Sequence, residues 1–281
     1  GMSVANGSSP ILDHVYFTYN EARQGGGLYT EDSSPQINNV AFSNNRARGF
    51  TSKKYLNTGV TSSADYFRHK GGGIYTEGTD SITLINVVFD NNIAEGDSFI
   101  FEHIPGPDIE TYLPGRGGGI YANNPYATKS TIAIINVSFN QNCAENTYNA
   151  GEGLNIYNES PYAINLNNSV RIGGYCGATH DIWGTLNSYS ATGLNNISAL
   201  SYLDNSMFND ISLPIGKDLK WGTADDGLIP AFGSTLIDGG DNSLNTISED
   251  ITGQNRIINS IIDVGAYEFT VCNDSTFYIG G

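Results

Sequence analysis

Apolar and polar residues alternate along most of this chain in short stretches that are bounded by Gly, Asn, Ser and Pro. The stretch from Ser81 to Phe89, Ser-Ile-Thr-Leu-Ile-Asn-Val-Val-Phe, is representative. A period of two residues is typical of β-strands, and no apolar stripe of helical period interrupts it before the last third of the chain. The pattern therefore predicts an all-β protein built from short strands.

Two phrases recur at regular intervals in the first half of the chain. Gly-Gly-Gly, then Leu or Ile, then Tyr, starts at Gly25, Gly71 and Gly117. The second phrase, Asn-Val-x-Phe-x-x-Asn-x-Ala, starts at Asn39, Asn86 and Asn136, and a degenerate copy occupies residues 15–22. Such repeats are the signature of a stacked solenoid. One unit has room for three short strands and three corners, which predicts one turn of a right-handed parallel β-helix.

Each repeated residue type has a physical role in such a coil. The glycines allow a positive φ and close packing at a corner. The Leu or Ile and the Phe of each unit are expected to point inward and to stack on their counterparts in the next turn. The Asn three residues after each Phe is expected to satisfy backbone groups at a bend and to bond the next Asn. The recurring Tyr at positions 29, 75 and 121 is consistent with a stacked ladder or with sugar binding, and we favour the ladder.

Two turns carry inserts of over twenty residues at the same corner, residues 48–70 and 95–116. The first insert is mostly basic and the second mostly acidic, and adjacent turns lie only about 5 Å apart, so we expect the two to dock on each other. Both a structural flap held by ion pairs and a ligand site remain open. The candidate ligand-binding residues are Tyr55, Tyr66, Arg68, His69, Lys70, Glu102, His103, Asp108, Tyr112 and Arg116.

The repeat dissolves in the last third of the chain. A shorter unit starts at Gly151, and a further strand is expected near residues 197–202. We predict β-helix turns over residues 1–204 and, over residues 205–281, a capping region of the same domain, since a solenoid needs an atypical terminal unit.

Composition narrows the classes of function. The 281 residues carry a formal net charge of -16, which disfavours duplex DNA and anionic bilayers as partners. No apolar run approaches the length of about 18 residues that a membrane span requires. Separately, we expect the protein to be a monomer. Of the three cysteines, Cys143 and Cys176 are candidates for a bridge, but buried free thiols are favoured. The start at Gly1-Met2 suggests that the natural chain continues upstream with a secretion signal.

The repeats resemble the passenger domains of polymorphic outer-membrane proteins, which carry GGAI and FxxN repeats on a β-helix. The end of the chain resembles the closing signature of bacterial choice-of-anchor Q proteins, which have a pectate-lyase-like β-helix. That signature matches residues 234–242, 250–256 and 263–269, and departs at Ser234-Thr235, where the family has Ser-Pro. The resemblance implies an exported, extracellular or bacterial cell-surface protein, and it carries over no catalytic residue.

Two other motifs suggest binding sites. The glycine triplets precede strands rather than a helix N-terminus, so they are not predicted to hold a phosphate. Asp238, Asp241 and Asn242 offer oxygens suited to calcium, although turn chemistry explains them equally well. The other carboxylates of the closing signature, with Arg256, are expected to form polar pairs within the cap.

Three functions therefore stay open. A carbohydrate-binding or adhesive protein, with a carbohydrate or a host or cell-surface protein as partner, fits the decorated corner best. A polysaccharide lyase or glycoside hydrolase is an alternative that rests on precedent for the fold, because no spaced pattern of acids and bases is present. A passive structural stalk is the third.

Overall fold

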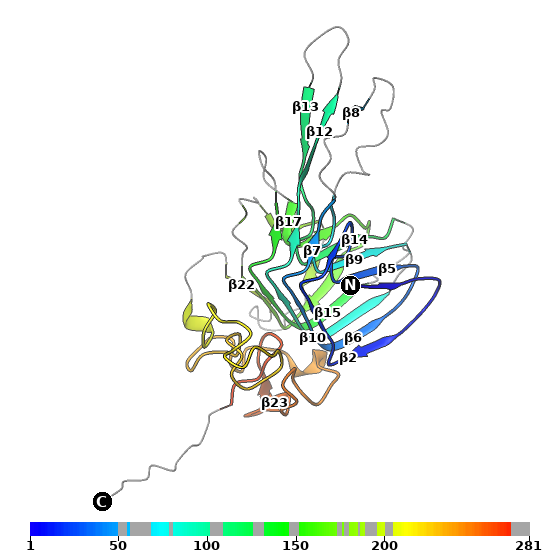
Figure 1. Cartoon of the computed structure of the whole chain (residues 1–281). Helices are drawn as coiled ribbons and strands as arrows, with labels where there is room; N and C mark the ends of the chain where they lie inside the picture. The colour runs from blue at the N-terminus through cyan, green and yellow to red at the C-terminus, as the bar shows by residue number, and fades with distance from the viewer. Residues whose placement is uncertain are drawn as a thin grey trace, which may run out of the picture.

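The computed structural model describes residues 1–49, 55–56, 69–78, 81–101, 109–125, 132–145, 152–172, 176, 180–184, 186–188, 196–199 and 205–270. Within them the chain winds through three parallel sheets, to which successive turns contribute strands (Figure 1). The predicted all-β parallel β-helix is confirmed.

The first sheet contains β1 (Met2–Val4), β5 (Leu28–Glu31), β9 (Ile74–Glu77), β14 (Ile120–Asn123), β17 (Glu152–Asn158) and β20 (His180–Trp183). The second sheet contains β2 (Ile11–Asp13), β3 (Tyr16–Thr18), β6 (Gln36–Ser43), β10 (Ile82–Asp90), β15 (Ile132–Asn140), β18 (Ile164–Asn167), β19 (Ser169–Ile172), β21 (Leu186–Ser188) and β22 (Asn196–Ala199). The third sheet contains β4 (Glu21–Ala22), β7 (Arg46–Ala47), β11 (Ile93–Ala94) and β16 (Cys143–Ala144). Equivalent residues of the repeats face one another, as Phe89 does Phe42 and Phe139.

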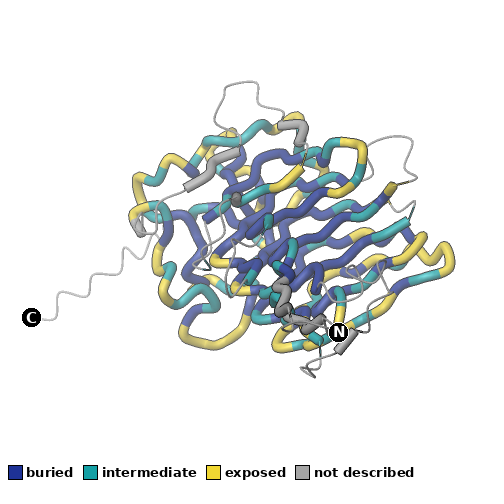
Figure 2. The backbone as a smooth tube through the Cα atoms, turned by 90° about the horizontal axis from the view of Figure 1, so that it is seen from above, coloured by how far each residue is buried: buried dark blue, intermediate teal, exposed yellow. Residues whose placement is uncertain are grey.

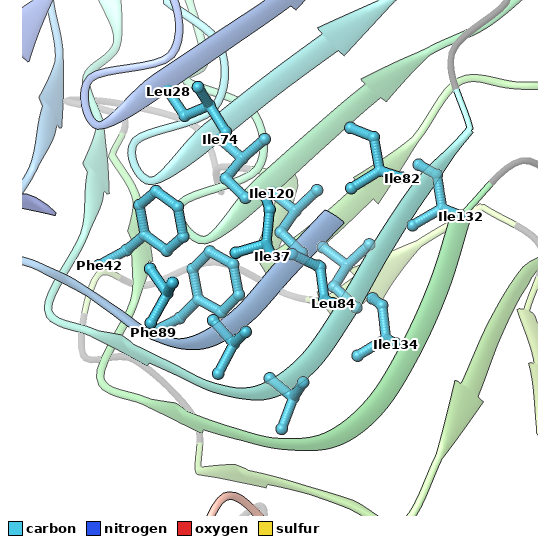
Figure 3. Packing of buried hydrophobic residues seen from close by; sticks show 14 of the residues in the cluster. Leu28, Ile37, Phe42, Ile74, Ile82, Leu84, Phe89, Ile120, Ile132 and Ile134 are labelled. Carbon is cyan, nitrogen blue, oxygen red and sulfur yellow. The ribbon is translucent and has the colours of Figure 1, made fainter. Parts of the chain in front are cut away.

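The inside of the coil is filled by columns of identical or similar side chains (Figure 3). Leu28, Ile74 and Ile120 form one column, and all are at most 1% exposed. The phenylalanines form another, in which Phe42 and Phe89 stack with ring centroids 5.1 Å apart. The buried positions follow the strands of the coil as continuous bands (Figure 2). Burial of these columns is the main favourable term for the coil, because apolar area leaves water in every turn.

The glycine triplet serves two separate needs. The first glycine of each block has a positive φ, which is +67° at Gly71. The second lies where two turns meet, and a Cβ on Gly72 would be 2.5 Å from the carbonyl oxygen of Gly118 and from the backbone nitrogen of Ile93. Both the conformation and the close approach exclude a side chain. The triplet is therefore a corner device, as the sequence predicts.

A ladder of buried asparagines lines the corner between the second and third sheets. Asn92 is fully buried, donates from Nδ2 to the carbonyl oxygen of Phe42 at 2.8 Å, and accepts at Oδ1 from Nδ2 of Asn45 at 2.9 Å. Asn142 repeats this arrangement one turn on, with Nδ2 3.0 Å from the carbonyl oxygen of Phe89. The predicted role of these asparagines is confirmed. They satisfy corner groups that water cannot reach.

Residues 205–270, which we call the C-terminal segment, pack along the side of the coil (Figure 1). This segment contains two short 3₁₀ turns, Asn205–Met207 and Asn242–Leu244, and a small hairpin of β23 (Ile257–Ile258) and β24 (Ile261–Ile262). Its apolar side chains, among them Trp221 and Tyr267, cover Ala41 and Val88, which point outward from the second sheet. The expected capping region thus covers a lateral face over several turns.

Hydrogen bonds from asparagines of successive turns hold the backbone of the C-terminal segment against the coil. Asn86 donates from Nδ2 to the carbonyl oxygen of Glu249 at 2.6 Å. Asn168 donates to the carbonyl oxygen of Asp241 at 3.0 Å and accepts from its backbone N–H at 2.8 Å. The outward asparagines at the bend of the second sheet therefore hold this segment in place.

The closing signature forms a buried polar cluster, as the sequence predicts. Arg256, which is 0% exposed, donates from Nη2 to the carbonyl oxygens of Asp263, at 3.0 Å, and Gly265. Its Nη1 lies 3.7 Å from Oε1 of Glu268. Asp250 accepts from the backbone N–H of Glu268 at 2.9 Å. These contacts join residues 250–256 of the C-terminal segment to residues 263–268.

The cysteines correct one prediction. Cys143 and Cys176 form a disulfide with Cα atoms 5.6 Å apart, whereas free thiols were the favoured expectation. The strands of the coil bring the two together from positions 33 residues apart in sequence, and a closed loop of that length stabilises a fold by about 3–4 kcal/mol in the chain-entropy account. Spacing alone did not indicate this, because the path of the chain between turns decides which thiols meet.

Asp90 is a buried carboxyl on the lateral face, where the equivalent residues are Ser43 and Asn140. Burial raises its pKa to about 6, although hydrogen bonds from Asn140 and Ser43 oppose the shift. Folding thus favours the protonated acid, so this stabilisation is present below about pH 4 and is lost as the pH rises through about 6. At pH 8 the Asp90 carboxylate is charged, and its burial lowers the free energy of unfolding.

We therefore expect Asp90→Asn to raise the free energy of unfolding at pH 8 by about 1–3 kcal/mol and to have little effect at pH 4. Urea denaturation at several pH values measures this. Glu249→Gln removes an exposed charge from the same interface as a control. A variant with the stability of the wild type at pH 8 would show that Asp90 is not a buried charge.

Candidate functional site: the insert corner

The two inserts meet outside the coil. β12 (Asp97–Phe101) and β13 (Ile109–Leu113) form an antiparallel hairpin, and β8 (Tyr55–Leu56) of the first insert pairs in parallel with β12. We call these three strands the arm. The arm projects away from the body of the coil (Figure 1). The prediction that the inserts dock on each other is confirmed at the level of the backbone, because β8 of one insert pairs with β12 of the other. Most of the charged side chains of the inserts lie outside the described residues.

His69 lies where the arm leaves the coil, and its side chain is only 5% exposed. Its Nδ1 lies 3.2 Å from the carbonyl oxygen of Glu95, and Nε2 lies 4.0 Å from Oδ2 of Asp97. Burial lowers the pKa of His69, against the opposing effect of Asp97. Gly49, at the start of the first insert, packs so closely that a Cβ there would clash with the imidazole. One buried ring therefore contacts the beginnings of both inserts.

The last residues of the two inserts belong to a column of charged side chains on successive turns. Lys70 and Arg116 occupy bridged positions directly before their glycine triplets, and Glu152 is bridged to Arg116 in the next turn. Nε of Arg116 lies 2.7 Å from Oε2 of Glu152, and Nη1 lies 3.6 Å from Oε1 of Glu159. Lys70 is 6% exposed, with Nζ 4.7 Å from the ring centroid of Tyr121. These cations are held by partners within the coil.

The tyrosines of the first sheet form the predicted ladder. Tyr75 and Tyr121 stack with centroids 5.2 Å apart, and Tyr157 and Trp183 extend the row. The hydroxyls of Tyr29 and Tyr75 both donate to Glu77, and burial raises the pKa of each phenol. Because each ring covers the face of the next, the inner rings have no open face for a sugar. Only Trp183 among them is strongly exposed, at 40%.

The structure brings three candidate residues together at the root of the arm: His69, Lys70 and Arg116. Tyr55 and Tyr112 lie on β8 and β13, and their side chains are not described. The candidates outside the described residues are Tyr66, Arg68, Glu102, His103 and Asp108. Sequence reasoning missed Glu95, Glu152 and Glu159 as partners, since neither the repeat nor the spacing marks them.

Two of the residues suggested for calcium binding, Asp241 and Asn242, use their side chains in hydrogen bonds to the local backbone. Oδ1 of Asp241 accepts from the backbone N–H of Ser243 at 2.9 Å and so caps a 3₁₀ turn. Asn242 donates from Nδ2 to the carbonyl oxygen of Ser260 at 2.7 Å and accepts from the N–H of Ile262. Asp238 is exposed and has a φ of 54°. Among the described residues, no group of three His, Cys, Asp or Glu side chains is placed to hold a metal ion.

Comparison with known proteins agrees with the repeat structure. Residues 39–77 and 86–123 match the Chlamydia polymorphic membrane protein repeat. No curated protein matches the chain significantly, and no solved structure does either. The matched stretches run from the bend of one turn through an insert to the next glycine triplet, so they include both inserts. In the described part of the chain, no helix is long and apolar enough to cross a membrane.

Proposed function

We propose that this protein is an exported, cell-surface adhesin in which the β-helix is a rigid support and the arm is the contact element. The observation that carries the proposal is that both inserts leave the coil at one corner and join in a sheet that extends away from it (Figure 1). The coil does not need the arm for its own closure, because adjacent turns without such inserts form the same three sheets. Binding residues are commonly carried on loops that a rigid scaffold positions.

Export is supported by two observations. The repeats resemble those of polymorphic membrane proteins, and the Cys143–Cys176 disulfide is consistent with an oxidising compartment. We further propose kinship with choice-of-anchor Q proteins, because the signature residues form one buried cluster around Arg256. Such a cluster explains the pattern as structural.

The arm can be removed without cutting the coil. Gly49 and His69 are in contact, so residues 50–68 are replaceable by a short Gly-Gly link. Asp97 and Leu113 are paired directly, so Asn-Gly in place of residues 98–112 closes them as a two-residue hairpin. We expect this variant to keep the circular dichroism spectrum of the wild type and to lose binding to epithelial cell layers by at least about tenfold.

The control is a variant with a scrambled order of residues 98–101 and 109–112, which keeps the composition and length of the arm. Undiminished binding after removal of the arm would contradict the proposal. Failure of the wild type to bind any cell layer or glycan would favour the passive stalk. Release of unsaturated sugars or new reducing ends from a polysaccharide would favour the enzyme.

A further inference from the structure

A second surface of the coil, at the corner that carries the asparagine ladder, has an aromatic residue where the following turns have an amide. The position directly before each ladder asparagine has a positive φ: 54° at Tyr19, 54° at Asn44, 50° at Asn91 and 48° at Gln141. Asparagine tolerates this conformation, whereas a bulky aromatic residue seldom adopts it. Tyr19 is nevertheless found there and is 80% exposed, so packing does not compensate for the conformation. Such an outlier raises the hypothesis of a function, which the surroundings of the ring must support.

A groove lies beside this ring. Its volume is about 280 Å³, and its lining includes Tyr19, Glu21, Asn44, Arg46 and Asn91. The groove follows the corner across three turns, since Tyr19, Asn44 and Asn91 belong to successive turns of the coil. It therefore combines one aromatic face with a row of amides at the spacing of the strands, about 4.8 Å.

The hydrogen-bonding groups in the groove are only partly used by the protein. Asn91, which is exposed, donates from Nδ2 to Oδ1 of Asn44 at 2.6 Å, and Asn44 donates from Nδ2 to Oγ of Ser43 at 2.8 Å. Such a chain of amides leaves donors and acceptors that face solvent, and hydroxyl groups act as both. Carbohydrate hydroxyls at successive positions suit a row of this kind.

The charges of the groove are balanced. Nε of Arg46 lies 3.1 Å from Oε1 of Glu95, and Nε of Arg48 lies 2.5 Å from Oε1 of Glu21. The chain as a whole carries a net charge of -16, which repels anionic ligands at long range. The groove therefore favours an uncharged ligand over a uronate or sulfated sugar.

We propose that the Tyr19 groove binds a neutral oligosaccharide. A pyranose ring stacks its C–H face on Tyr19, and the hydroxyls of the following sugar units bond Asn44 and Asn91, beside the ion-paired Glu21 and Arg46. The groove lies on the coil rather than on the arm. The proposal is therefore independent of adhesion through the arm, and either can fail alone.

Tyr19→Asn tests the proposal without harming the fold, because it restores the residue type of the two following turns at a positive φ. We expect equal or higher thermal stability and a loss of affinity of at least about tenfold. The probes are gluco-, manno-, xylo- and chito-hexasaccharides, titrated by saturation-transfer NMR and calorimetry, with hexagalacturonate as the anionic comparison. Tyr162→Asn, which removes another exposed tyrosine, is the control.

Binding of at least one neutral hexasaccharide by the wild type and by Tyr162→Asn, with loss in Tyr19→Asn, supports the groove. If the protein that lacks the arm still binds this hexasaccharide, and loses it on Tyr19→Asn, the binding site is on the coil and not on the arm. The proposal is overturned if no neutral hexasaccharide binds, if Tyr19→Asn binds as tightly as the wild type, or if hexagalacturonate binds more tightly than every neutral sugar.

Discussion

Replacing Asn92 by Ala is expected to lower the free energy of unfolding by about 3–5 kcal/mol. Asn92 accepts from the backbone and side chain of Asn45 and donates to Phe42 and Asn142, all at 3.1 Å or less. Alanine removes these four hydrogen bonds at a buried site, although Asn45 keeps its bond to Phe17 and Asn142 keeps the backbone N–H of residue 92. The effect is large because one side chain connects three turns of the coil.

Urea denaturation followed by circular dichroism measures this loss. The matched control is Asn91→Gly at the neighbouring position, which is exposed and has a φ of 50°. Glycine keeps that conformation, so we expect a change below about 1 kcal/mol. If the two variants were equally stable, the asparagine ladder would not be a source of stability.

Replacing Arg256 by Ala is expected to release the C-terminal segment from the coil. Removal of one member of a buried ion pair costs about 3–5 kcal/mol, and here Glu268, Asp250 and Asp263 would remain in the same cluster. Burial raises the pKa of Glu268 to about 8, while Arg256 opposes the shift. Without Arg256 the pKa rises further. Above about pH 8 the folded state must then either bury an unpaired carboxylate or take up a proton, so the loss of stability grows as the pH increases.

Limited proteolysis and hydrogen exchange distinguish this outcome from global unfolding. We expect residues 205–270 to lose protection while the strands of the coil keep theirs, and the loss to be larger at pH 9 than at pH 6. Arg48→Ala is the control, because Arg48 pairs with Glu21 at the surface, where both side chains are over 40% exposed. Cooperative loss of protection throughout the chain would show that the coil depends on the C-terminal segment.

The coil was predictable from sequence because each of its features occurs several times. Phe42, Phe89 and Phe139 are recognisable as one column only because their neighbours repeat with them. The ladder extends to Tyr157 in the shorter unit that starts at Gly151, and then to Trp183 without a matching phrase, since stacking needs only an aromatic ring at the same register. Repetition thus reveals the turn, and single residues remain harder to interpret.

Features that occur once were not predictable in the same way. Ala41 and Val88 lie in the apolar runs Val-Ala-Phe and Val-Val-Phe, which are typical of a strand buried on both faces, but nothing in the sequence indicates that Trp221 and Tyr267 cover them. The disulfide depends on the return of the chain to Cys143 after another turn. His69 and Arg116 were chosen for their place in the inserts, but their buried partners are set by the register between turns.

In the proposed adhesin the coil is the support and the inserts make the contact with the cell. A complete single-substitution library displayed on yeast, sorted once for folding and once for attachment to epithelial cell layers, separates these two roles. We predict that substitutions which abolish attachment but preserve folding concentrate in residues 50–68 and 98–112. An equal spread of such positions over the coil and the C-terminal segment, or no attachment by the parent protein, would contradict it.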